Sequence, residues 1–144
     1  MKNIRMESPS TKSVRHFLKK WDKSENYLIK EKCLNKLFKE QYKYNHNVEE
    51  VLTKVCCLNE LYSIKIKAID LLGVTNHIVS LNVDEHINNN DYSLVNDISN
   101  WGGNKYYCFA TKFCSFQRPE AYPIYDQIVN NVLWTFKKKD NFFD

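Results

Sequence analysis

The stretch GGNKYYCFATKFCSFQRPEAYPIYD, residues 102–126, contains the features on which the prediction of the fold depends. Its two leading glycines predict a turn, and the aromatic residues that follow recur at helical spacing over 105–117. Residues 118–124 include two prolines and cannot form a regular helix. Asp126 then stands where a last helix begins. The expected order is therefore helix, glycine turn, helix, proline loop and helix.

Helical periodicity extends through the rest of the chain. Ser10 and Thr11 can cap a first helix, Ser24 a second and Asn47 a third, because these side chains accept hydrogen bonds from free backbone N–H groups. The segment 64–73 begins with a strand-like alternation, but we interpret it as a helix that its final glycine stops. The predicted helices, seven or eight in all, cover 11–21, 24–42, 48–63, 64–73, 76–87, 94–98, 105–117 and a last segment from 126.

The composition favours one all-α domain. The chain has 144 residues, of which 43% are hydrophobic, enough to fill one continuous core. Glycine and proline number only three each, too few for the many tight turns of a sandwich or barrel. No repeat or linker divides the chain, so we expect a single helical domain over 1–144, without a sheet of three or more strands.

Charge and cysteine content restrict the function classes. The net charge of +4 fits either an ordinary soluble surface or a polyanionic partner. The five cysteines lack CxxC spacing, so neither a metal site nor a cofactor is expected, and most are interpreted as small buried hydrophobic residues in a reducing compartment. Neither a signal peptide nor a membrane span is recognisable in the sequence, so we expect a cytoplasmic protein without a membrane partner.

The stretch 102–126 has an interpretation that requires no function. The glycines make a turn, and Asp126 caps the last helix through its carboxylate. Tyr122 and Tyr125 pack on the core with their hydroxyl groups at the surface. Under this interpretation the segment only connects helices.

The segment WGGNKYYCFATKFCSFQRPEAYPIYDQIV, residues 101–129, also resembles the helix-hairpin-helix DNA glycosylases. EEVLTKVCCLNELYS, residues 49–63, resembles that family's early helix beside the base pocket. The resemblance implies a compact multi-helix fold in which a hairpin between two helices binds the DNA backbone through N–H groups. It also implies a lysine nucleophile at the start of the second helix and an assisting aspartate at the start of the next.

Carried over residue by residue, the resemblance places Lys105 at the nucleophile and Asp126 at the assisting carboxylate. Gly102, Gly103 and Asn104 would form the hairpin, with Lys105 beside the DNA backbone. The two adjacent glycines depart from the family's separated pair, so Asn104 stands where the second glycine is expected. Lys112 is a rival nucleophile, because a helix over 105–117 would place it on nearly the same face as Lys105.

A second resemblance covers most of the chain. Blocks such as LNKLF, LNELYS, FATKFCSF and PEAYPIYD are similar to a group of uncharacterised bacterial proteins. It implies a shared fold, and because those proteins are longer at the C-terminus, it also implies that Asp144 is a truncated end.

Two functional hypotheses follow. The first is a DNA-binding protein with base-excision activity, which needs a reactive lysine, an ionised aspartate and an apolar pocket for an extruded base. Aromatic side chains could line that pocket or fill the core: Tyr62, Trp101, Tyr106, Tyr107 and Phe109. The alternative is a non-catalytic helical module that binds a protein partner, in a bacterial stress or defence system.

Overall fold

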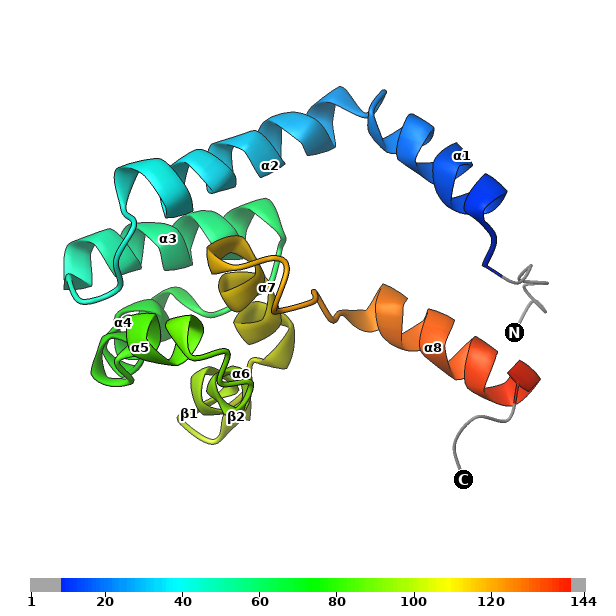
Figure 1. Ribbon diagram of the computed structural model, residues 1–144. Helices are drawn as coiled ribbons and strands as arrows, with labels where there is room; N and C mark the ends of the chain where they lie inside the picture. The colour runs from blue at the N-terminus through cyan, green and yellow to red at the C-terminus, as the bar shows by residue number, and fades with distance from the viewer. Residues whose placement is uncertain (1–8, 141–144) are drawn as a thin grey trace.

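The computed structural model describes residues 9–140, and the expected truncated end at Asp144 lies outside the described residues. The described chain is mostly helical, which confirms the all-α prediction, and its one sheet has two strands (Figure 1). The elements are α1 (Thr11–Trp21), α2 (Glu25–Lys36), a π-helical turn η1 (Leu37–Gln41), α3 (Val48–Leu61), a 3₁₀ turn η2 (Ala68–Asp70), α4 (Leu71–Ser80), α5 (Val83–Asn88), α6 (Ser93–Ser99), β1 (Asn100–Trp101), β2 (Asn104–Lys105), α7 (Tyr107–Gln117) and α8 (Gln127–Asp140).

Helix α7 lies at the centre of the fold. Its residues from Phe109 to Phe116 are all buried, so nearly the whole helix is enclosed rather than one stripe of it. It packs against α3, α6 and η1. Phe38 of η1 meets Phe113 at 5.3 Å and Phe116 at 5.6 Å between ring centroids. The phenylalanines of α7 therefore fill the core, as the helical spacing predicts, whereas Tyr107 of the same helix is 42% exposed.

Helices α1 and α8 project from this core toward the same side in Figure 1. Both begin at the predicted caps. Ser10 and Ser13 form a reciprocal capping box at the start of α1. The Asp126 carboxylate accepts hydrogen bonds from the first backbone N–H groups of α8. Asn47 caps α3 in the same way, through a hydrogen bond from the Glu50 N–H.

The prediction for 64–73 was wrong. Residues 64–67 are irregular, η2 follows, and α4 starts at Leu71 and continues through Gly73 to Ser80. Gly73 does not end the helix. Its lack of a side chain instead allows the Trp101 ring to lie against α4. A Cβ atom at Gly73 would stand 2.2 Å from Cζ2 of Trp101. The helix expected over 76–87 is likewise split, because Asn82 adopts a left-handed conformation between α4 and α5.

The helix expected over 105–117 starts two residues later. Gly102 and Gly103 have φ of 59° and 76°, the left-handed pair that a two-residue hairpin turn needs. They join β1 to β2 with Asn100 opposite Lys105 and Trp101 opposite Asn104. Lys105 therefore lies on a strand, and Asn104 is not in a left-handed position. The expectation that Lys105 and Lys112 share a helical face was wrong.

Two smaller expectations were also wrong. The Tyr122 hydroxyl is not at the surface: the side chain is buried, and its O–H donates to the Asp91 carbonyl at 3.0 Å. Of the five cysteines only Cys114 is buried, while Cys33 is exposed and the other three are intermediate. The fold thus uses aromatic and aliphatic residues, rather than cysteines, as its main filling.

We predict that Gly73→Ala destabilises the protein although alanine is the better helix former. Alanine gains about 1 kcal/mol of helix propensity. The added methyl group would overlap the Trp101 ring, and such overpacking costs about 1–3 kcal/mol. The net loss is measurable as a lower urea midpoint with an unchanged slope. A midpoint equal to or above that of the wild type would contradict the close packing of Trp101 on α4.

Candidate functional site

Lys112 is a charged residue in the buried part of α7, with a side chain that is only 5% exposed. Its Nζ atom lies 3.3 Å from Oδ2 of Asp126 and 3.1 Å from Sγ of Cys108, one helical turn earlier. The Nζ atom also stands 5.3 Å from the ring centroid of Tyr62, at the end of α3. A lysine amine, a carboxylate, a thiol and an aromatic face are therefore collected at one point.

Asp126 connects this cluster to α8. Its Oδ1 atom accepts hydrogen bonds from Ile128 N and Val129 N, both at 3.0 Å, while Oδ2 faces Lys112. The hydrogen bond from the Val129 N–H contributes most to holding the pKa of Asp126 below its usual value of 3.8. Burial opposes it, and the charge and hydrogen bond of Lys112 and the Ile128 N–H add to the lowering. The carboxylate is therefore ionised at neutral pH, and capping and ion pairing act together.

Thr111 holds Lys112 and Asp126 close to each other. Its hydroxyl donates to the Tyr125 carbonyl at 3.0 Å and accepts from the Tyr125 N–H at 3.2 Å. The residue before Asp126 is thereby joined to the residue before Lys112. Tyr125 and Asp126 belong to the proline loop, which has no helix of its own to position it. These two backbone contacts bring the Asp126 carboxylate to the Lys112 amine.

Lys105 is not part of the contacts described for this cluster. It is exposed on β2, and among the described residues the ion pair of Asp126 is formed with Lys112. Gly102, Gly103 and Asn104 are also exposed around the hairpin turn. The structure thus brings Asp126 together with the rival lysine, and presents the four hairpin residues to solvent.

The aromatic residues proposed for a base pocket take different positions. Phe109 is fully buried and packs on Phe113 at 5.8 Å between ring centroids. Trp101 lies against Gly73 of α4. Of the five residues, Tyr62 has its ring against the Lys112 amine, with 5.3 Å between Nζ and the ring centroid. Burial raises the pKa of the Tyr62 hydroxyl, and the Glu31 charge adds to this effect.

The sequence analysis missed a second buried amine. Lys54 of α3 is fully buried, and its Nζ atom donates to the Tyr44 carbonyl and to Oδ1 of Asn45, each at 2.9 Å. Asn45 in turn donates through its backbone N–H to Asp84 of α5 at 2.9 Å. It also accepts from the Gln117 amide of α7 at 2.9 Å. The network joins three helices through one loop.

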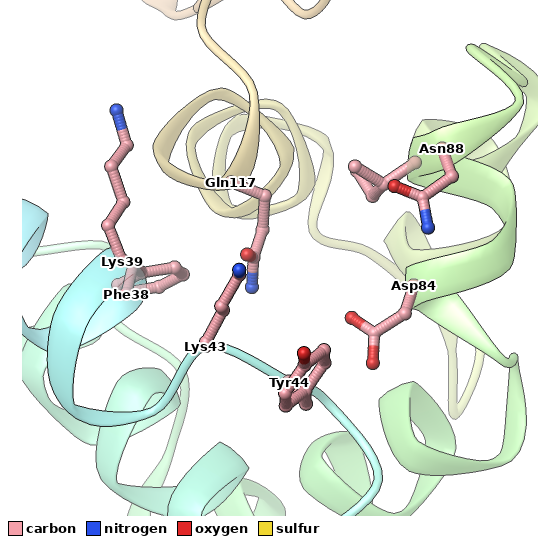
Figure 2. A pocket seen from close by; sticks show the side chains of 8 residues that line it. Phe38, Lys39, Lys43, Tyr44, Asp84, Asn88 and Gln117 are labelled. Carbon is pink, nitrogen blue, oxygen red and sulfur yellow. The ribbon is translucent and has the colours of Figure 1, made fainter.

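A small pocket of about 190 Å³ lies beside this network. Figure 2 shows Gln117 of α7 and Asp84 of α5 on its two sides, with Lys43 and Tyr44 along the segment that leads to α3. Both carboxylate oxygens of Asp84 accept hydrogen bonds from Asn45, and Nε2 of Gln117 donates one to Oδ1 of Asn45. Spacing could not have predicted this site, because Asn45, Asp84 and Gln117 are far apart in sequence and have no shared motif.

We predict that Lys54 makes stability rise with pH between about 8 and 10.5. Burial lowers its pKa from 10.5 to about 8, so in that interval the unfolded state binds more protons than the folded state. The difference in unfolding free energy between wild type and Lys54→Met should therefore grow in favour of the wild type over this interval. Urea titrations at pH 7.5 and 10.5 measure it, and the tyrosines and cysteines common to both proteins cancel. An unchanged or shrinking difference would contradict the depressed pKa.

The fold and the cluster define a mostly helical domain with a buried lysine–aspartate pair where its last helix begins. The chain belongs to the family described as HI_0787_N, an N-terminal domain, which matches residues 13–121. It is 39% identical over 100 residues to an uncharacterized protein of Haemophilus influenzae, a match that covers 66% of this chain and 49% of that protein. The chain thus spans about half the length of this relative. No solved structure matches.

Two further findings concern the described residues 9–140. None of their helices is long and apolar enough to cross a membrane. Within the same range, histidine, cysteine, aspartate and glutamate side chains do not gather in groups of three or more that could hold a metal ion.

Proposed function

We propose that this protein binds DNA and excises a base, with Lys112 as the attacking amine and Asp126 as the assisting carboxylate. The observation that carries the proposal is the pair itself: a lysine amine with a 5% exposed side chain, 3.3 Å from an ionised carboxylate at a helix start. Buried amines and carboxylates held together are typical of sites that need a nucleophile and a stabilising charge. The resemblance to helix-hairpin-helix glycosylases supports base excision and the role of Asp126, but it places the nucleophile at Lys105 rather than at Lys112.

In the proposed reaction, the unprotonated Lys112 amine attacks C1′ of the target nucleotide. A C–N bond to the enzyme forms as the glycosidic C–N bond breaks, and the base leaves with a proton. Opening of the sugar ring then gives a Schiff base. The Asp126 carboxylate stabilises positive charge that develops on the sugar, because it stays ionised through its hydrogen bonds to α8.

The exposed hairpin is assigned to the DNA backbone. Gly102 and Gly103 have no side chains, and open space surrounds the position of a Cβ atom at each, so a phosphate can approach the backbone there. Lys105 follows with an exposed ammonium group. The amine of Lys112 becomes accessible when the side chains that cover it move, and α8 projects from the core with few contacts to other helices. The proposal therefore requires a shift of α8 on binding.

We predict that borohydride traps a covalent complex with one member of a panel of lesion-containing duplexes. Only a Schiff base is reduced to a stable amine link, so the trapped peptide identifies the lysine. Lys112→Gln should abolish trapping, whereas Lys105→Gln should keep trapping and weaken duplex affinity, with a smaller dependence on salt. Asp126→Asn keeps the helix cap, since asparagine caps about as well as aspartate, but it removes the partner charge of the buried Lys112, so it should be less stable than the wild type and should lose excision.

Three results would contradict this assignment. Trapping by Lys112→Gln would remove Lys112 from the reaction, and full excision by a folded Asp126→Asn protein would remove Asp126. Absence of duplex binding by the wild type at low salt would end the DNA proposal altogether. Thermal melts of each variant show whether a loss comes from unfolding.

The second candidate function is the non-catalytic helical interaction module. The observation that favours it is the apolar face of α1, where Val14, Phe17, Leu18 and Trp21 are exposed and none of the helix is buried. In that case Lys112 and Asp126 only attach α8 to α7. Asp126→Asn lowers stability under both candidates, but only the enzyme would also lose excision.

A further inference from the structure

The thiol of Cys108 lies against the Lys112 amine because one helix carries both residues. They stand four positions apart on α7, so their side chains leave the same face of the helix. The Nζ atom of Lys112 is 3.1 Å from Sγ of Cys108, within hydrogen-bond distance of the sulfur. The backbone of α7 thus places a thiol and an amine side by side without help from any other element.

The Lys112 amine is held at this position from other directions as well. Oδ2 of Asp126 lies 3.3 Å from Nζ, and the centroid of the Tyr62 ring lies 5.3 Å from it. The Lys112 side chain is only 5% exposed. An amine held in this way beside the sulfur reacts with it in preference to a reagent from solution, because proximity and orientation are already provided.

The cysteines of the chain differ in what surrounds their thiols. Cys114, also on α7, is buried, and burial raises the pKa of its thiol to about 12, so this thiol stays protonated and unreactive at neutral pH. Cys33 is exposed on α2. Cys108 is partly exposed, so a small oxidant reaches its sulfur while the Lys112 amine lies beside it. Cys108 therefore combines access from solvent with a fixed neighbouring nucleophile.

We propose that oxidation by hydrogen peroxide joins Cys108 to Lys112 through a covalent sulfur–nitrogen bond, a sulfenamide. Sulfenic acids condense with nearby nitrogen atoms in this way. Because the two residues are neighbours on one face of α7, the bond closes between adjacent turns of a helix that is already formed. The pair is thus a modification site for a peroxide, and thiols reverse the modification.

The reaction has two steps. In the first, an S–O bond forms on Cys108 as the O–O bond of the peroxide breaks; the sulfur is oxidised by two electrons, the peroxide is reduced, and water leaves. In the second, the Lys112 amine, after its ammonium group has lost a proton to water, attacks the sulfur. The S–N bond forms as the S–O bond breaks, and the hydroxyl group leaves as water with a proton from the amine.

The cross-link acts on the site that the proposed function uses. It converts the Lys112 amine into a sulfenamide nitrogen, which carries no positive charge for Asp126 and cannot form a Schiff base. Peroxide would therefore switch off base excision and a thiol would restore it, a consequence that rests on the proposed function. The cross-link itself does not rest on it, because its formation is read from mass alone.

The test is peptide mass spectrometry of the full chain after treatment with a small molar excess of hydrogen peroxide. The proposal predicts a peptide that contains both Cys108 and Lys112, is lighter by two hydrogen atoms and is no longer cleaved by trypsin after Lys112. Dithiothreitol should restore both the mass and the cleavage. Cys108→Ser, which leaves the amine and its ion pair with Asp126 in place, should show neither change.

Lys112→Arg provides the matched control at the amine. Arginine keeps a positive charge for Asp126, but its guanidinium group is not a nucleophile at neutral pH. Oxidation of Cys108 should then stop at the sulfenic acid, and its dimedone adduct should be at least about tenfold more abundant than in the wild type, where the amine competes from within the chain. Thermal melts check that both variants are folded.

Several products would overturn the proposal. A Cys108 that stays a thiol, proceeds to sulfinic acid or joins another cysteine, with cleavage after Lys112 retained, contradicts it, and so does equal dimedone labelling of the wild type and Lys112→Arg. Borohydride trapping separates this result from the proposed function. A cross-linked wild type that traps no duplex when reduced keeps the modification and loses the enzyme, whereas trapping without a cross-link does the reverse.

Discussion

The burial of the Lys112 amine in α7 is the constraint on which the C-terminal half of the structure depends. An ammonium group removed from water needs a partner charge and hydrogen-bond acceptors, or its burial is prohibitively costly. Asp126 supplies the charge, and Cys108 and Tyr62 surround the rest of the group. Since Asp126 also caps α8, satisfying one buried amine fixes where the last helix begins.

The two buried lysines are accommodated differently. Lys54 faces a carbonyl, an amide oxygen and the Phe38 ring, with Asp84 one residue further away through Asn45. Burial therefore outweighs the attraction of the Asp84 carboxylate and lowers the pKa of Lys54 to about 8. Lys112 meets its carboxylate directly. The Lys54 network holds a loop among three helices. The Lys112–Asp126 pair holds a carboxylate beside an amine, the arrangement that the proposed chemistry uses.

The sequence predicted those features that depend on neighbours along the chain. The aromatic spacing of α7, the caps at Ser10, Asn47 and Asp126 and the break at the prolines are all local, and each is confirmed. Gly73 was misjudged because its reason is Trp101, a residue that comes close only in the fold. Lys105 was placed on a helix because periodicity does not distinguish a hairpin turn just before a helix from the helix itself.

The candidate site could be predicted in part. Lys112 and Asp126 were both candidates, but their pairing depends on the Thr111 contacts that bring the proline loop to α7, which no spacing rule contains. The network of Lys54, Asn45 and Asp84 was missed because a lysine within a helical pattern is usually exposed. Periodicity correctly gave the apolar face of α1, but it contains no information on what covers that face.

The measurement that tests the central claim most directly is a carbon-13 NMR titration of the Asp126 carboxyl carbon in the wild type and in Lys112→Gln. The Val129 hydrogen bond and the Lys112 charge both lower the pKa of Asp126, so the wild-type carboxyl should titrate below 3.8. In Lys112→Gln its pKa should rise yet stay below 3.8, because the backbone hydrogen bonds remain. An Asp126 pKa that is the same in both proteins would contradict the buried lysine–aspartate pair.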